Sequence, residues 1–395
     1  MTLALTLSDG RGAVLGLAPA ATSIGIGADV SSWDLAGRPF VLVRGDSTWR
    51  RGLDGRLLEK RPAAGGEPRR RRLVGPAEGE PVIEAAREDA GLVLQSLRSG
   101  GAASDDAPAR LRTILGMDAA ALADDARRFG AACARVGILP PDQYLALVLR
   151  VTEGCSWNAC TFCGFYRDVP FRVKTPQELL AHAAAVREYF GAGLSLRRSV
   201  FLGDANALCV AHDRLLPLVE AAARSFPGRG LHAFVDAWTG RRKTAAEYRA
   251  YAALGLRRVY VGLETGDPGL LSWLQKAGTP DDAGELVRTL HEAGVAVGVI
   301  VLLKVGGARF AETHVRATAE TLTRMRLRGD DLLYFSDFVD DPQLDYGRRA
   351  TEPDLRPLDE AGCARQRAAI RAAFRPADGA RPPRTASYDV REFLY

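Results

Sequence analysis

The apolar residues of the second half of the chain follow two alternating spacings. Short β-branched or apolar runs, typical of buried strands, alternate with segments in which apolar residues recur at helical spacing. The predicted strands cover residues 145–151, 199–202, 232–236, 258–263, 296–303 and 331–335. Strands that alternate with helices predict a parallel sheet with right-handed crossovers, closed or partly closed into a barrel. Active sites of such barrels lie at the carboxyl ends of the strands.

The helices between these strands carry clear start and stop signals. Thr175 followed by proline predicts a helix that runs to Phe190, and Thr279 followed by proline predicts another that runs to Ala293. In both, threonine is the expected N-cap and proline the first helical residue. We expect Asp213 to cap a third helix and Gly294 to end the second.

The rest of the chain has a different pattern. Residues 1–80 contain short alternating apolar segments and glycine-rich turns, among them a predicted hairpin turn at Leu53-Asp54-Gly55. Residues 61–81 are rich in Pro, Gly and Arg and predict an exposed loop, whereas residues 84–137 predict two or three alanine-rich helices. A last helix is expected at 358–374, before a Pro- and Arg-rich tail that either frays or covers the open side of the barrel. The predicted organisation is an α+β accessory region (1–140), a partial barrel (141–345) and a C-terminal helix and tail (346–395).

Composition supports an ordinary globular protein. The 395 residues are 47% hydrophobic and 26% charged, which is enough to bury a core and argues against widespread disorder. The net charge of +5 is weak evidence for nucleic-acid binding, and the arginine run at 69–72 is better explained as a solvated loop than as a phosphate site. No apolar run approaches the length of about eighteen residues that a membrane span needs, and the first residues do not resemble a signal peptide. We therefore expect a cytoplasmic protein.

Three of the six cysteines lie close together immediately after the first predicted strand. They are Cys155, Cys160 and Cys163, whereas Cys133, Cys209 and Cys363 are scattered singly. Clustered cysteines in a chain without a secretion signal indicate a metal or redox site rather than a disulfide framework. Three thiolates can bind three irons of a cubane cluster and leave the fourth iron open, whereas structural zinc takes four protein ligands. Zinc, with Cys209 or a distant histidine as fourth ligand, is the alternative; the five histidines show no metal-ligand spacing.

This cysteine loop resembles that of the radical S-adenosylmethionine (SAM) superfamily. Phe162 stands where the family has an aromatic residue before the third cysteine, but the first spacer has four residues where the commonest pattern has three. Further similarity covers about residues 145–340: Gly203-Asp204 and Asn206 fall at the glycine-rich SAM motif, and Glu264-Thr265 on the fourth strand resembles the branch of oxygen-independent coproporphyrinogen oxidases and RNA-modifying enzymes. The subfamily is left unassigned.

The resemblance implies a [4Fe–4S] cluster on Cys155, Cys160 and Cys163 in a partial (β/α)6 barrel. The expected SAM contacts are Phe162, Gly203, Asp204, Asn206, Asp236, Glu264, Thr265, Ile300 and Leu302. Acidic residues after strands can instead be N-caps of the next helix, and Asp236 is equally compatible with a loop-stabilising role. We further expect Arg167 to lie near the cluster and Tyr334, at the end of the sixth strand, to face substrate.

The resemblance also implies the chemistry. The reduced cluster would cleave SAM to methionine and a 5′-deoxyadenosyl radical that abstracts hydrogen from a substrate, so the enzyme would be oxygen-sensitive and would need a reductant such as flavodoxin or ferredoxin. No second cysteine group and no cobalamin-binding signature is present. A small-molecule or biosynthetic substrate is favoured over RNA because no RNA-binding module is evident. An iron–sulfur or zinc protein without SAM chemistry is the third alternative.

Overall fold

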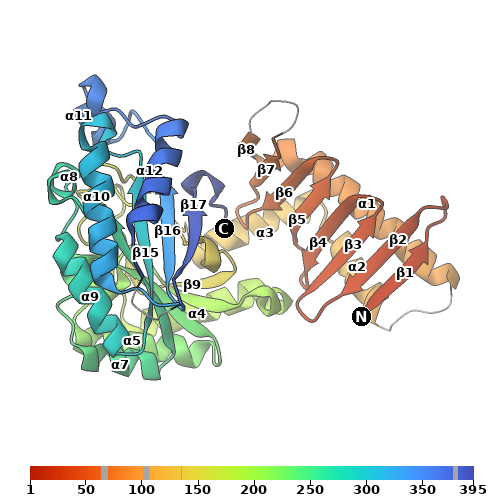
Figure 1. The fold of residues 1–395 in the computed structure, drawn as a ribbon. Coiled ribbons are helices and arrows are strands. Elements are labelled where there is room, and N and C mark those ends of the chain that lie inside the picture. Colours follow the sequence, from red (N-terminus) through yellow and green to blue (C-terminus); the bar gives the residue numbers. More distant parts are fainter. Residues whose placement is uncertain (64–69, 101–105, 135, 377–380) are drawn as a thin grey trace. The chain divides into compact units, whose positions relative to one another are not determined.

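The computed structural model describes residues 1–63, 70–100, 106–134, 136–376 and 381–395, which form two compact units. The N-terminal unit comprises Met1–Arg135, Ala184–Arg198 and Arg391–Tyr395, and the barrel unit comprises Val136–Ala183 and Ser199–Val390 (Figure 1). The predicted boundaries placed 346–395 apart from the barrel, which differs from the structure: residues up to Val390 group with the barrel because their strand and helix pack on it. No helix in the described ranges is long and apolar enough to cross a membrane.

The N-terminal unit is built on an eight-stranded antiparallel sheet in which every strand pairs with its neighbours in sequence. The hairpin expected at Leu53–Gly55 is present, since Arg51 pairs with Leu57 across it and Gly55 has a positive φ. The strands are β1 (Thr2–Thr6), β2 (Gly12–Leu17), β3 (Ala21–Ile26), β4 (Asp29–Asp34), β5 (Pro39–Arg44), β6 (Ser47–Arg51), β7 (Leu57–Arg61) and β8 (Arg70–Val74).

Helices cover one face of this sheet and close its hydrophobic core. They are α1 (Pro76–Gly100), α2 (Asp106–Leu115) and α3 (Ala119–Cys133). Alternate strand residues such as Leu15 and Trp33, both fully buried, pack against α1 and α2. The loop predicted for 61–81 is wrong over its second half, because β8 pairs with β7 and α1 begins at Pro76. Arginine is not a characteristic strand residue, so the run of arginines gave no sign of a strand whose conformation is decided by its pairing with β7.

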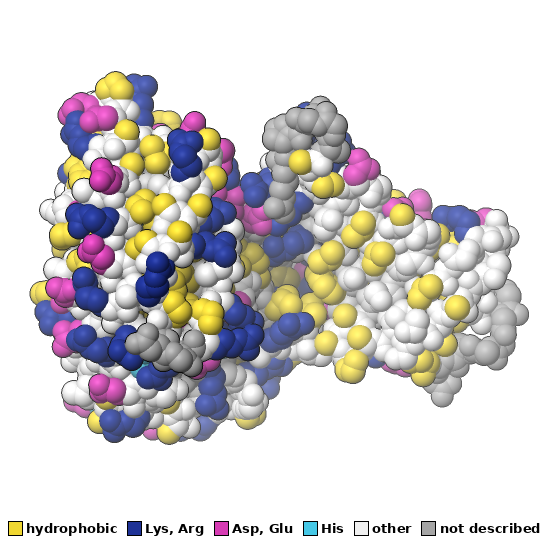
Figure 2. Space-filling model, viewed as in Figure 1, with side chains coloured by type: hydrophobic (Ala, Val, Ile, Leu, Met, Phe, Trp, Pro, Cys, Tyr) yellow, Lys and Arg dark blue, Asp and Glu magenta, His cyan; other side chains and the backbone are white. Residues whose placement is uncertain are grey.

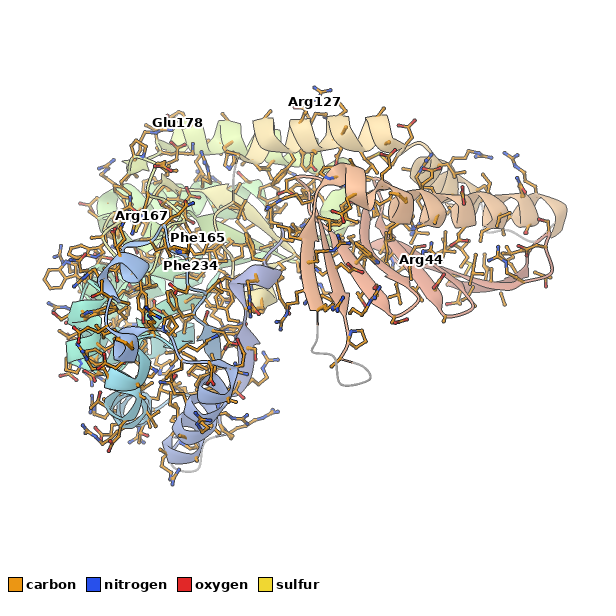
Figure 3. The ribbon with its side chains drawn as sticks, turned by 90° about the horizontal axis from the view of Figure 1, so that it is seen from above. Arg44, Arg127, Phe165, Arg167, Glu178 and Phe234 are labelled. Atoms are coloured by element: carbon orange, nitrogen blue, oxygen red, sulfur yellow. The ribbon has the colours of Figure 1, made fainter. Side chains whose placement is uncertain are left out.

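A buried ion network ties the N-terminal unit together. The Arg38 guanidinium donates to Asp125 on α3 at 2.7 Å, to Asp34 on β4 at 3.3 Å and to the Tyr189 carbonyl at 2.7 Å. Arg44 on β5 reaches Asp89 on α1 at 2.7 Å, and Figure 3 shows it beside that helix. The charges of Arg38, Asp34 and Asp125 are almost fully buried, so their pairing compensates the cost of removing them from water.

The barrel unit holds a seven-stranded parallel sheet. All six predicted strands are present, and their order in the sheet is their order in sequence from β9 to β17. The strands are β9 (Ala146–Arg150), β12 (Ser199–Gly203), β13 (Gly230–Val235), β14 (Leu256–Glu264), β15 (Ala296–Leu303), β16 (Leu332–Asp337) and β17 (Arg384–Tyr388), with a short β10–β11 hairpin (Thr152–Glu153, Arg172–Val173) after β9. The mixed α/β partial barrel expected from the sequence is therefore confirmed.

The seventh strand, β17, was not predicted. The tail, which was expected either to fray or to cover the open side of the barrel, pairs in parallel with β16, from Leu332 opposite Arg384 to Ser336 opposite Tyr388. The buried Tyr388 hydroxyl donates to the Leu139 carbonyl, just before β9. A polar strand of this kind, exposed at four of its five residues, has no apolar alternation from which it could be recognised.

The barrel helices begin and end close to the expected residues. Thr279 caps α9 through a capping box with Asp282, and Gly294 follows that helix with a positive φ. The expectation for Asp213 is wrong: α5 begins at His212 after Ala211, so Asp213 lies in the first turn. The helices are α4 (Pro176–Phe190), α5 (His212–Ser225), α6 (Ala237–Gly240), α7 (Ala245–Ala253), α8 (Pro268–Trp273), α9 (Pro280–Glu292), α10 (Gly307–Met325), α11 (Asp345–Arg349) and α12 (Glu360–Ala373).

Candidate active site

The three clustered cysteines lie on the loop that follows β9 and β10, at the carboxyl ends of the parallel strands. Cys155, Cys160 and Cys163 are free thiols, and all three are partly buried. Burial, together with repulsion from the Cys163, Glu264 and Cys155 charges, raises the pKa of Cys160 to about 12. The thiols are thus near enough to interact, as ligands of one metal group must be.

The backbone of this loop is tightly specified at its start. Gly154 has a φ of +73°, and a Cβ at this position would meet the Val169 carbonyl oxygen at 2.4 Å. After the cysteines, the Arg167 guanidinium donates to the Cys163 carbonyl at 3.1 Å and pairs with Asp345 at 3.0 Å. Figure 3 labels Arg167 beside Phe165 on this segment. Arg167 therefore lies beside the cysteine loop, as expected, and orders its C-terminal half.

A second segment holds the loop from the side of α8. Both the amide and the hydroxyl of Thr161 donate to the Leu274 carbonyl, at 2.9 and 3.2 Å. The Trp157 indole donates to the Gln275 carbonyl at 2.8 Å. The next residue, Lys276, is close enough to Cys160 for its positive charge to favour the thiolate. Docking of residues 274–276 thus fixes a cation next to the cysteines, a role that the sequence pattern did not reveal.

Asp204 lies at the end of β12, beside the first residues of the cysteine loop. Its side chain is buried, accepts the Gly154 amide at 3.1 Å, and has a pKa raised to about 6 by burial. The Asp204 amide donates to the Thr152 carbonyl at 3.1 Å. Gly203 keeps this strand end close to β9, since a Cβ would meet Val148 at 3.3 Å. Within the described ranges, the Gly154 amide is the one hydrogen-bond donor to the Asp204 carboxyl group.

Asn206 and Asp236 bind each other rather than standing as separate contacts. The Asn206 amide group donates to Asp236 and to Ser156 of the cysteine loop, and its carbonyl oxygen accepts the Asp236 amide at 3.2 Å. Asp236 also accepts the Thr239 amide at 2.8 Å as the N-cap of α6. The loop-stabilising alternative for Asp236 is therefore observed, and Asn206 links two strand ends to the cysteine loop.

Glu264 ends β14 and forms a buried pair with Lys276. The carboxylate accepts the ammonium at 3.0 Å, and Gly262 leaves room for both side chains, because a Cβ there would meet Glu264 at 2.3 Å. Burial opposes the charge on Lys276, but the Glu264 and Cys160 charges outweigh it and raise its pKa. The Lys276 ammonium is thus held charged next to the cysteine loop.

Thr265 does not present its side chain to the site. It is fully buried, and its hydroxyl is hydrogen-bonded to His314 on α10 at 2.7 Å and accepts the Asp267 amide at 3.0 Å. The expected SAM contact through this hydroxyl is therefore wrong, because the side chain turns away from the strand end toward α10. His314, to which the sequence assigned no role, holds the loop after β14.

Apolar side chains complete the interior. Ile300 and Leu302 alternate with Gly298 along β15, so the three residues share one face of the strand. Leu302 belongs to a buried cluster with Leu270 and Tyr346, against which Phe162 packs. These residues provide an apolar wall close to the cysteine loop.

The side chain of Tyr334 points toward the amino ends of the strands, whereas it was expected at the carboxyl ends. Its hydroxyl donates to Asp142, which precedes β9, at 2.7 Å, and Tyr260 donates to the same carboxylate at 2.6 Å. The expectation that Tyr334 faces substrate is wrong, because its side chain points toward the amino ends of the strands, where it helps to fill the barrel.

The donor set agrees with an iron–sulfur cluster. Thiolates are the usual ligands of such clusters, the three thiols interact electrostatically, and the Asn158 amide lies 3.4 Å from the Cys155 sulfur. Cys209 lies near Ser156, and burial raises its pKa. Among the described residues, no three His, Cys, Asp or Glu side chains are gathered into a ready-made metal site.

Comparison with known proteins identifies this part of the chain. The family model described as the radical SAM superfamily matches residues 149–314, which includes the cysteine loop and strands β12 to β15. No curated protein matches the chain significantly.

Solved structures with detectable similarity include several radical SAM enzymes. The radical SAM methyltransferase TsrM from Kitasatospora setae is 21% identical, with a TM-score of 0.41, over 52% of this chain and 36% of that one. Methylornithine synthase (PylB) is 16% identical, with a TM-score of 0.42, over 75% and 77%. Coproporphyrinogen III oxidase (HemN) from Escherichia coli is 14% identical, with a TM-score of 0.44, over 62% and 55%.

The matches are partial, and they do not single out a substrate. The chain spans little more than a third of the TsrM chain, and these identities and scores carry no argument for a particular reaction. The match of residues 149–314 does bear on the family. Residues 149–314 form a radical SAM domain, and enzymes of that superfamily use a [4Fe–4S] cluster and S-adenosylmethionine.

Proposed function

We propose that Cys155, Cys160 and Cys163 hold a [4Fe–4S] cluster and that the protein uses it to cleave SAM and act on a small-molecule or biosynthetic substrate. When bound, the cluster and SAM supply a 5′-deoxyadenosyl radical that abstracts hydrogen. The observation that carries the proposal is the position of the three thiols, on one loop at the carboxyl ends of the strands. Asp204, after β12, and Glu264, at the end of β14, lie at the same ends. A flavodoxin or ferredoxin would supply the electron.

The polar residues at the strand ends suit the amino and carboxylate groups of the methionine part of SAM. Asp204 offers a buried carboxyl group as acceptor for the SAM amine, and Gly203 permits close approach of the backbone. Asn206 and Asp236 position the Ser156 side of the cysteine loop rather than bind directly. Their mutual hydrogen bonds support a positioning role.

The Glu264–Lys276 pair offers SAM and the cluster one negatively and one positively charged side chain. Lys276 carries a positive charge near Cys160, which suits an anionic cluster and a carboxylate, while Glu264 suits the ribose hydroxyls. Phe162, Ile300 and Leu302 would line the adenine side and exclude water. Thr265 contributes only by fixing the loop through His314.

Ion pairs in the arginine run at 69–72 favour a small-molecule substrate over RNA. The Arg71 side chain pairs with Glu392 at 2.6 Å, and Arg72 pairs with Glu59 at 3.2 Å and also with Glu78. Arg69 lies outside the described residues. Arginines whose charge is already balanced by carboxylates are poorly suited to neutralising phosphates. Binding of labelled RNA that weakens steeply with added salt would support the RNA alternative instead.

The proposal is tested by anaerobic cluster reconstitution followed by incubation with dithionite and SAM. We expect the wild type to bind about four irons per chain and to form 5′-deoxyadenosine. We expect Cys160→Ala to lose both properties, because one of three ligands is gone. No 5′-deoxyadenosine from the wild type, or equal amounts from the variant, would overturn the proposal.

A matched cysteine variant separates the cluster from zinc. Cys209→Ala removes the thiol near Ser156, and under the cluster proposal it keeps its iron and its 5′-deoxyadenosine. A four-thiol zinc site would lose its metal in both variants. Metal analysis of the three proteins, wild type, Cys160→Ala and Cys209→Ala, therefore distinguishes the two.

A further inference from the structure

Strand β1 leaves one edge of the N-terminal sheet open. Within the described part of the chain it pairs with β2 alone, and Figure 1 shows it as the outermost strand of that sheet. It has no charged residue, no proline and no bulge in its pairing with β2. Proteins usually protect exposed edges with such features. The described part of the opposite edge strand, β8, is protected in this way by Arg70, Arg71 and Arg72.

The direction of the free backbone groups follows from the ladder. Met1 exchanges hydrogen bonds with Leu17, and the Leu7 amide donates to the Arg11 carbonyl. Because hydrogen-bonded pairs alternate along antiparallel strands, Leu3 and Leu5 bond to β2, while the amides and carbonyls of Thr2, Ala4 and Thr6 point away from it. Three donors and three acceptors thus lie along the open edge.

The sequence of β1 is the same read in either direction: Thr-Leu-Ala-Leu-Thr, centred on Ala4. A two-fold axis at Ala4 places Ala4 opposite Ala4 of a second copy and Thr2 opposite Thr6, and all three outward-pointing residues then find partners. The same register places Leu3 opposite Leu5 on the face that carries the core. Both leucines are only partly buried in the single chain, where they pack against the core of the N-terminal unit.

We propose that two copies of this chain associate through antiparallel pairing of their β1 strands, which joins the two eight-stranded sheets. A two-fold interface uses the same patch on both subunits, and the palindromic strand meets that requirement with six backbone hydrogen bonds and two Leu3–Leu5 contacts. Figure 2 shows few charges over the exposed face of β1 to β5, where Ala4 and Val14 lie in one row. Strand β1 itself has no charged side chain that would face its copy across the axis. The pairing is independent of the radical chemistry proposed for the barrel unit.

The proposal is tested by sedimentation velocity of the full chain over a concentration series. We expect a reversible monomer–dimer equilibrium, and we expect Ala4→Lys to raise its dissociation constant at least about tenfold, because two lysines then face each other across the axis. Val14→Lys is the matched control: it adds the same charge on the same face one strand inward, where Val14 is 49% exposed, and should leave the equilibrium nearly unchanged.

A second variant and a second measurement distinguish loss of the dimer from misfolding of the Ala4→Lys variant. Ala4→Pro removes an amide that points away from β2, so the ladder between β1 and β2 is kept and only the dimer is lost. Hydrogen exchange of the peptide containing β1 should be slower at concentrations where the wild type is dimeric, and fast in both Ala4 variants. A wild type that stays monomeric throughout, or a dimer that neither Ala4 variant weakens, would overturn the proposal.

Discussion

The two units bury their sheets to different extents. The N-terminal unit covers one face of an antiparallel sheet with helices and leaves the other face to solvent, so its strands alternate between buried and exposed residues. The barrel unit surrounds a parallel sheet with helices, and strands such as β12 and β15 are buried at nearly every position. Polar groups in the barrel are therefore concentrated at the strand ends, where the cysteine loop lies.

The buried charges of the two units also differ in kind. In the N-terminal unit they form a structural network around Arg38 and Asp125, whereas in the barrel unit Asp204 and the Glu264–Lys276 pair lie beside the cysteines. All five histidines of the chain belong to the barrel unit. The comparison predicts that the two units respond differently to charge removal and to pH.

The largest effect is expected for removal of Asp125. Asp125→Asn leaves Arg38 and Arg51 with less compensating charge in a buried environment, which should lower the free energy of unfolding by about 3 kcal/mol. The neighbouring Asp124→Asn is the control, because Asp124 pairs with the exposed Arg127, and we expect a change within about 0.5 kcal/mol. Denaturant unfolding followed by hydrogen exchange should place the loss in the N-terminal unit. Equal effects of the two variants would contradict the network's role.

Acid should act on the barrel unit first. Burial lowers the pKa of His232 to about 4, below the value of 6.5 expected for the unfolded chain, and the pKa of His314 to about 4. Between these pH values the histidines bind protons in the unfolded state but not in the folded state. The free energy of unfolding therefore falls as pH drops from about 6.5 to about 4, by at most about 3 kcal/mol for His232.

The variant His232→Phe should remove part of this acid sensitivity. Among the described residues, the buried Nδ1 atom of His232 has no hydrogen-bond partner, and its ring lies beside that of Tyr260, so phenylalanine is tolerated. We expect a flatter dependence of stability on pH between about 6.5 and about 4. An unchanged slope in His232→Phe would refute the assignment.

The sequence predicted the barrel unit better than the N-terminal unit, for identifiable reasons. Apolar strands, and threonine–proline pairs at helix starts, are local signals, so they predicted β9, β12 to β16 and α9. The spacing of Cys155, Cys160 and Cys163 is equally local. Strands β8 and β17 are polar, so neither has the apolar alternation of a strand, and their conformations are decided by backbone pairing with β7 and β16.

Within the site, predictions failed where a side chain's direction mattered. Sequence position placed Thr265 and Tyr334 near the strand ends, but contacts with His314 and Asp142 turn their side chains elsewhere. Lys276 was missed as a site residue because it approaches the cysteines only through the docking of residues 274–276 on the cysteine loop. This docking depends on packing between segments more than a hundred residues apart in sequence.

The smallest effect tests one of the local signals on which the barrel prediction rested. Thr279→Ala removes the side chain that accepts the Asp282 amide at 3.1 Å and should destabilise the barrel unit by about 1 kcal/mol. Thr289→Ala, in the same helix, is the control: its hydroxyl only bonds back to the Glu285 carbonyl, and alanine favours the helix, so stability should be unchanged or slightly higher. Denaturant midpoints at a constant m-value measure both. If both variants lose the same stability, the cap does not define the start of α9, and the threonine–proline signal predicted the helix for another reason.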